Sequence, residues 1–249
     1  MKGLFYRELY LQRKGILAVI ITFFVFNLLG LLLYLSMLHG NLGKIYSSEE
    51  DIQGIHSVLF TVFTYFSSFI IMLMPAEAFG LVASDYAVGW MRFQRCMPYK
   101  PVHYTLVKMG LMAAELLVGF VLAVGNAFIN RKIYGVDMLP EELLLPIVLL
   151  MVLCCGMSLL MTILTLLTRS KTGVAPAMVL VALYVAFMFL LALLPEEVWT
   201  DLENWFMTTI KGNMMAFLKK LVPWALGIIA VLLTGSFFAM NALFKRREK

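Results

Sequence analysis

The chain has 249 residues, of which 62% are hydrophobic and only 14% are charged, and its formal net charge is +5. A soluble domain carries about 25% charged residues, so this composition excludes most classes of soluble enzyme. In a soluble chain the positive charge would suggest nucleic acid. Here the basic residues adjoin long apolar segments, where anionic lipid headgroups account for them. We therefore expect a membrane protein surrounded by lipids, with no nucleic-acid partner.

The N-terminal segment, residues 1–14, has the pattern of an amphipathic helix on the inner membrane surface. Its apolar residues Met1, Leu4, Phe5 and Leu9 recur at helical spacing, and basic residues occupy the rest of the circumference. The sequence predicts a short helix that leads into the first span. A positively charged tail that only sets the orientation is the alternative.

Six apolar segments are each long enough to cross a membrane as a helix, which needs about 20 residues. They are residues 15–38, 55–82, 102–129, 143–167, 173–194 and 221–244. These segments lack the alternation of polar and apolar residues that is typical of membrane barrels. The predicted fold class is an all-α integral membrane protein with six transmembrane helices, forming a single domain over residues 1–249.

The charges indicate which side of the membrane each loop faces. Fourteen of the 20 Lys and Arg residues lie in the N-terminal segment, in the loops after the second and fourth spans, near the start of the third span (Lys108), and in the C-terminal tail. Ten of the 15 Asp and Glu residues lie in the other loops. Because cytoplasmic loops are enriched in Lys and Arg, we predict a multi-pass protein of the cytoplasmic membrane with both termini inside the cell.

Two of the predicted loops have a composition or a residue spacing that indicates a specific structure. Residues 84–101 form a short, basic and aromatic cytoplasmic loop, in which Pro98 and Pro101 exclude one continuous helix. Its aromatic residues, such as Trp90, could instead be headgroup anchors. Residues 195–220 form the longest outer loop, whose apolar residues at helical spacing predict an interfacial or re-entrant helix. An ordinary surface helix is the alternative for this loop.

Two carboxyl groups lie inside the predicted spans. Glu115 is near the middle of the third span, where a lone carboxylate costs on the order of 2.5–3.5 kcal/mol, so it should face protein or water. It is a candidate proton relay, cation site or substrate contact, with a structural hydrogen bond as the alternative. Glu77 follows Pro75, which should kink the second span, and is expected near the inner end of a cavity. Lys108 is expected to extend to the inner interface.

The sequence contains no convincing active site. Ser158 lies in a Gly-Met-Ser context, but the three histidines are near span ends and none lies in the last two spans to act as its base. No G-x-x-x-x-G-K phosphate loop and no zinc-type H-x-x-x-H spacing occurs. We therefore expect no catalytic residue, no metal and no cofactor in this chain.

A motif of moderate specificity joins the second span to the third. It consists of Pro75, Asp85, Gly89-Trp90, Met97-Pro98, Tyr104 and Lys108. In this order the residues resemble those of permease subunits of the ABC-2 type transporter family. More narrowly, the chain is similar to the small bacterial six-span branch that includes exporters of modulin-like peptides. It departs from the commonest pattern at Tyr99-Lys100-Pro101, where a Ser/Arg turn is usual.

The resemblance implies a non-catalytic permease that is driven by a separate ATPase. Residues 84–101 would contain the helix that docks on the ATPase, residues 1–14 an elbow helix, and residues 195–220 a re-entrant segment near the exit. The implied ATPase-coupling residues are Asp85, Tyr86, Trp90, Arg92, Phe93 and Arg95. Two permease chains, identical or different, would assemble with two copies of a cognate ATPase that hold ATP and Mg.

The substrate implied by the resemblance is an amphipathic peptide or another membrane-partitioned molecule, moved out of the cell. A different class of function stays open at this point. The chain could be an ion- or proton-coupled secondary carrier that uses Glu115, which would need no ATPase partner.

Overall fold

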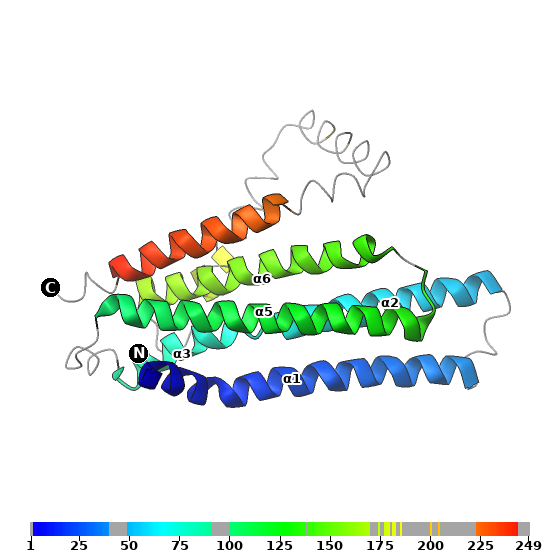
Figure 1. Ribbon diagram of the computed structural model, residues 1–249, viewed down its shortest axis with the longest axis horizontal. Coiled ribbons are helices and arrows are strands. Elements are labelled where there is room, and N and C mark those ends of the chain that lie inside the picture. Colours follow the sequence, from blue (N-terminus) through cyan, green and yellow to red (C-terminus); the bar gives the residue numbers. More distant parts are fainter. Residues whose placement is uncertain are drawn as a thin grey trace. The chain divides into compact units, whose positions relative to one another are not determined.

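The computed structural model describes residues 2–39, 49–90, 100–137, 139–169 and 223–243, with a few isolated residues between 174 and 204. Within these residues every regular element is an α-helix, which confirms the all-α prediction. The labelled helices are α1 (Lys2–His39), α2 (Glu49–Met72), α3 (Ala76–Ala87), α5 (Pro101–Tyr134) and α6 (Pro140–Thr168) (Figure 1). A further helix, Pro223–Leu243, lies near the C-terminus.

Five helices among the described residues are long and apolar enough to cross a membrane, as expected of a membrane protein. The five segments are Lys2–His39, Gly54–Met72, Val102–Tyr134, Leu143–Thr168 and Pro223–Leu243. Each overlaps one of the six predicted spans, although the helix in the second span ends at Met72 and not at residue 82. The remaining predicted span, residues 173–194, and the predicted re-entrant segment, residues 195–220, lie largely outside the described residues.

The chain divides into two compact units. The first contains Met1–Ala78 and Leu106–Cys155, and the second contains Phe79–Thr105 and Gly156–Lys249. In the first unit α1 and α5 run in the same direction, and α2 runs opposite to both (Figure 1). This is the arrangement expected of a first, second and third crossing that are joined by short loops.

The core of the first unit draws on four helices. Aromatic and aliphatic side chains of α1, α2 and α5 pack with the first half of α6, and the free thiol of Cys154 is buried among them. The fully or nearly fully buried members are Phe23, Phe60, Ile71, Met72, Met74, Ala123, Ala127, Tyr134, Leu143, Ile147 and Cys154. These residues fix the helices of the first unit around one apolar centre.

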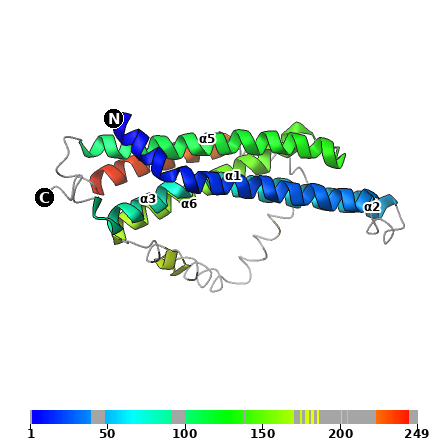
Figure 2. The ribbon, with the colours of Figure 1, turned by 90° about the horizontal axis from the view of Figure 1, so that it is seen from below.

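Helix α1 is continuous from Lys2 to His39, and its first turns lie at an angle to the rest of the helix (Figure 2). The buried residues of these turns are Leu4, Glu8 and Gln12, which are spaced by four positions and so lie on one face. The apolar residues Phe5 and Leu9 are exposed. The buried face of the N-terminal segment is therefore partly polar, whereas the sequence predicted an apolar one.

The second predicted span is interrupted at Pro75, as its sequence indicated. Helix α2 ends three residues earlier and α3 begins directly after the proline. Because Pro75 has no N–H, the carbonyl of Ile71 has no partner four residues on and instead accepts a bond from the Met74 N–H at 3.3 Å. A Cβ atom on Gly119 of α5 would lie 3.0 Å from this carbonyl oxygen. Glycine therefore lets α5 pass directly over the break.

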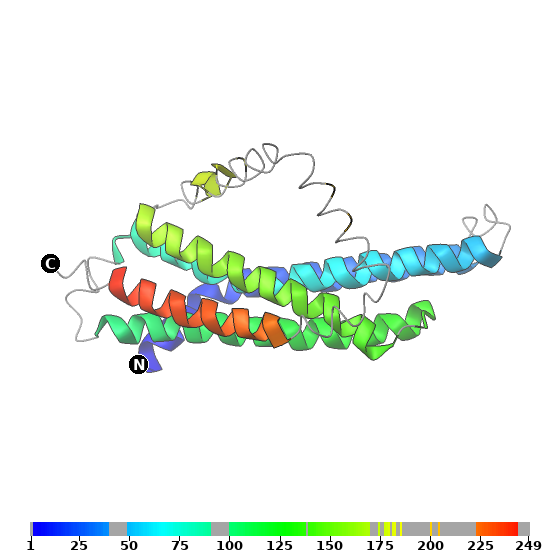
Figure 3. The ribbon, with the colours of Figure 1, turned by 90° about the horizontal axis from the view of Figure 1, so that it is seen from above.

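In the second unit, the second half of α6 and the C-terminal helix lie side by side and run in the same direction (Figure 3). A Cβ atom on Gly156 would lie 3.6 Å from Leu232 Cδ1, which is an ordinary van der Waals distance. The two helices therefore approach closely at Gly156, where the space also accommodates a Cβ atom.

Candidate functional site

A hydrogen bond closes the base of the loop between α3 and α5. Asp85, in the last turn of α3, is 1% exposed, and its Oδ2 accepts a hydrogen bond from the hydroxyl of Tyr104, which is fully buried near the start of α5. Helix α3 ends at Ala87, and Gly89 follows with a φ of +73°, the left-handed conformation that favours glycine after a helix. The two ends of the loop are thus held together by buried side chains.

The predicted ATPase-coupling residues fall into three groups by their surroundings. Asp85 is buried, so it positions the loop and does not present its carboxyl group to a partner. Tyr86 and Trp90 are half-buried at the end of α3 and just after it. The other three predicted residues, Arg92, Phe93 and Arg95, lie outside the described residues.

A buried ion pair joins the N-terminal segment to the start of the third span. Lys108 Nζ lies 2.7 Å from Glu8 Oε2, and the two side chains are 2% and 1% exposed. Arg7 forms a second ion pair with the other oxygen of Glu8. The expectation that Lys108 extends to the membrane interface is therefore wrong. The acid that holds the lysine inside lies 100 positions away in the sequence.

Glu115 is buried, at 5% exposure, on α5. It precedes Gly119 by one helical turn, and Gly119 is the residue that packs on the interrupted backbone of the second span. The carboxyl group is therefore close along α5 to a break in a membrane helix, a feature that lines binding sites in many transporters. Glu77 lies in the first turn of α3, and its side chain is outside the part of the chain that the structure describes.

A network of polar side chains links α1, α2 and α5 in the first unit. Asn130 donates to Thr64 Oγ1 at 3.1 Å and to Asn27 Oδ1 at 3.4 Å, and Asn126 donates to Ser67 Oγ at 2.9 Å. Such bonds hold helices together where water is absent. None of these residues was predicted from the sequence, since the predicted intramembrane candidates were the two carboxyl groups of Glu77 and Glu115. Asparagines inside otherwise apolar runs were the available signal.

No group of three or more His, Cys, Asp or Glu side chains within the described ranges could hold a metal ion. Comparison of the chain with family models, with curated proteins and with solved structures found no match.

The candidate functional residues are chosen by their burial inside helices that are otherwise apolar. They are the Asp85–Tyr104 pair at the loop, the Glu8–Lys108 pair, and Glu115 near the helix break.

Proposed function

We propose that the chain is the transmembrane permease subunit of an ATP-driven exporter of the ABC-2 type. The single observation that carries the proposal is the hydrogen bond between Tyr104 and Asp85. It joins the last turn of α3 directly to the start of α5. A displacement of one of these helix ends would therefore be transmitted to the other, which is what a coupling element between an ATPase and a membrane domain has to do.

The Glu8–Lys108 pair supports the same function. Tyr104 and Lys108 are four residues apart in α5, hence one turn apart on similar faces. A displacement of the loop that moves the start of α5 would therefore also move the N-terminal segment, through the ion pair at 2.7 Å. This is the mechanical role of an elbow helix, which we assign to residues 1–14.

The proposed topology is supported by the charge distribution, whereas the proposed assembly and substrate come from the resemblance to ABC-2 type permeases. Six spans with both termini in the cytoplasm place the basic segments inside the cell. Two permease chains, identical or different, would assemble in the cytoplasmic membrane with two copies of an ATPase that binds ATP and Mg. The transported molecules would be amphipathic peptides or other membrane-partitioned compounds, moved outward.

A co-purification experiment tests the coupling assignment. The tagged chain is expressed with its cognate ATPase, and capture of the ATPase and ATP-dependent export are measured for the Trp90→Ala/Arg92→Ala double variant. We expect both to be lost, whereas the control His39→Gln, at an exposed residue in the last turn of α1, should retain both. If ATPase capture and export survive in the double variant, the loop is not the coupling element.

The burial of Glu115 beside the interrupted second span favours one alternative, an ion- or proton-coupled carrier. Reconstitution of the chain alone into vesicles separates the two functions. A carrier would transport its substrate under an ion gradient without any ATPase, and Glu115→Gln would abolish that transport. The exporter proposal requires that transport appears only when the ATPase and ATP are added.

A further inference from the structure

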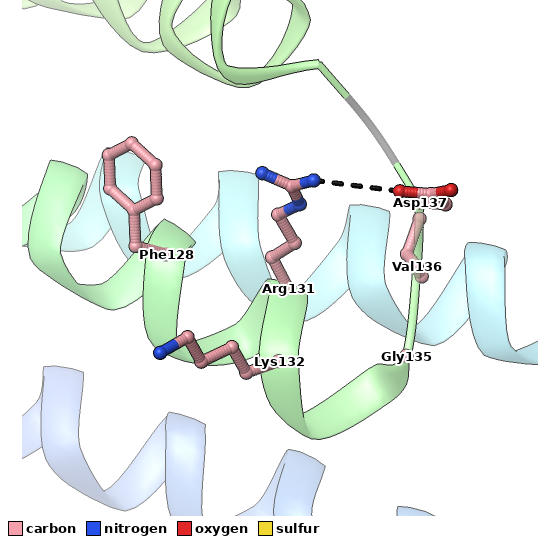
Figure 4. Close-up of a pocket in the computed structure, with 6 residues that line it drawn as sticks. All are labelled: Phe128, Arg131, Lys132, Gly135, Val136 and Asp137. Atoms are coloured by element: carbon pink, nitrogen blue, oxygen red, sulfur yellow. Dashed lines mark ion pairs between the residues drawn. The ribbon is translucent and has the colours of Figure 1, made fainter.

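The end of α5 that lies away from Lys108 carries a pocket that the proposed function does not use. Its volume is about 580 Å³, within the range of roughly 300–1,000 Å³ that is typical of small-molecule sites. It is lined by Phe128, Arg131, Lys132, Gly135, Val136 and Asp137 (Figure 4). Two basic side chains, one carboxylate and one aromatic ring thus line one open surface pocket.

The pocket forms because α5 ends in a turn that brings the chain back. Gly135 has a φ of +62°, and the Val136 N–H donates to the Arg131 carbonyl at 3.3 Å, a pattern typical of helix C-termini. This turn places Asp137 opposite the Arg131 side chain, while the Lys132 side chain points away from Asp137 (Figure 4). The cations therefore line the pocket from two directions.

The positive charge of the pocket is only partly neutralised. The Arg131–Asp137 pair spans 3.6 Å, and its side chains are 29% and fully exposed, so the pair is weak and easily exchanged. Lys132 is exposed and makes no ion pair with the side chains that the structure describes. Basic residues at a helix C-terminus also interact favourably with the helix dipole. An interaction of Arg131 and Lys132 with the helix dipole, however, would need neither a pocket nor an adjacent aromatic ring.

The position of the pocket along the span indicates its ligand. The apolar segment Val102–Tyr134 has 33 residues, about 50 Å of helix at about 1.5 Å per residue. This length exceeds the hydrocarbon thickness of roughly 30 Å and the roughly 40–45 Å that includes the headgroups. Two adjacent cations are excluded from the hydrocarbon, so we expect Arg131 and Lys132, in the last turn, at or just beyond the level of the headgroups. Phe128, 38% exposed, lies one turn nearer the membrane centre.

We propose that this pocket binds the phosphate group of an anionic membrane lipid. Arg131 offers planar paired donors that match phosphate oxygens, Lys132 supplies a second positive charge, and Phe128 contacts the glycerol and the upper acyl chain. Asp137 competes with the phosphate for Arg131. This assignment concerns the membrane and does not rest on the proposed transport function.

Photo-crosslinking of the full-length chain tests the assignment at the site itself. The purified protein is reconstituted with photoactivatable phosphatidylglycerol, and the label is mapped by mass spectrometry to the peptide that contains residues 128–137. We expect Arg131→Gln/Lys132→Gln to reduce labelling of this peptide by about tenfold or more, because charge-assisted hydrogen bonds are lost. Asp137→Asn should increase labelling, since it removes the competing carboxylate.

Control variants and competitors distinguish the sources of phosphate. The control variant Arg13→Gln/Lys14→Gln removes two basic residues from the first half of α1, outside the pocket. It should leave labelling of this peptide unchanged. Unlabelled phosphatidylglycerol should compete, whereas phosphatidylcholine and millimolar inorganic phosphate should not. Displacement by inorganic phosphate would mean that a soluble anion is the ligand and would overturn the lipid assignment. Equal labelling in the Arg131/Lys132 variant, a loss of labelling in Asp137→Asn, or equal competition by phosphatidylcholine would also overturn it.

Discussion

Lys108 Nζ lies 2.7 Å from Glu8 Oε2 in a contact from which water is almost wholly excluded. A buried ion pair loses the hydration of two charges, and their attraction compensates for this only while both partners are present. Glu8 is the only acidic residue among the first 48 residues. The pair therefore holds one particular face of the N-terminal segment against α5, and a shifted register would leave the lysine without its acid.

Removing one partner of this pair should destabilise the protein more than removing both. Glu8→Gln removes the carboxylate that pairs with the buried ammonium of Lys108, which costs about 3–5 kcal/mol. The double variant Glu8→Gln/Lys108→Met should recover most of that loss. The measurement is thermal unfolding in detergent, read as a double-mutant cycle. Arg7→Gln is the control, because Arg7 is partly exposed and its loss should cost under about 1 kcal/mol.

The hydrogen bond at the base of the loop gives a second prediction. Tyr104→Phe keeps the buried ring and removes the hydroxyl that donates to Asp85. Loss of this hydrogen bond to a buried carboxylate costs about 1–3 kcal/mol. If the loop transmits movement, export per ATP hydrolysed should fall while ATPase capture is retained. Tyr10→Phe, at an exposed tyrosine, is the matched control and should change neither. Unchanged coupling in Tyr104→Phe would separate this bond from transport.

The positions of the described spans could be predicted from the sequence because apolar length alone sets them. The break at Pro75 was also predictable, since a missing N–H acts locally whatever the surrounding helices do. The end of the second span was predicted less well. The loop was predicted to begin at residue 84, yet α3 continues to Ala87. The signal for this end is Gly89, because a glycine just after a helix commonly terminates it.

The contacts of the candidate site could not be predicted in the same way. Glu8 and Lys108 are 100 residues apart, and only the packing of α1 beside α5 brings them together. The spacing of Leu4, Glu8 and Gln12 was visible, but a polar buried face is recognisable only once its partner is known. Asp85 was assigned to a docking surface by resemblance. Its burial against Tyr104 depends on helix packing that no short motif encodes.

The asparagine network predicts a graded loss of stability. Asn130 donates to side chains of two other helices, whereas Asn126 donates to one described side chain, that of Ser67. Interhelical hydrogen bonds in membranes contribute about 0.6 kcal/mol on average and about 1.7 at most. Asn130→Ala should therefore cost about twice as much as Asn126→Ala, measured by unfolding in mixed detergent micelles. An equal or larger loss in Asn126→Ala would contradict the network.

Two glycines should respond to alanine with opposite signs. A Cβ atom on Gly30 would lie 2.5 Å from Phe63 Cγ and 2.8 Å from Tyr134 Oη, whereas a Cβ atom on Gly125 would meet nothing within 4 Å. Gly30→Ala should therefore force α1 away from α2 and α5, at a cost of about 1–3 kcal/mol. Gly125→Ala should stabilise α5 by up to about 1 kcal/mol, because alanine has the higher helix propensity. Thermal unfolding of both variants in the same detergent measures the difference. If Gly30→Ala is as stable as Gly125→Ala, α1 does not approach Phe63 and Tyr134 as closely as these distances require.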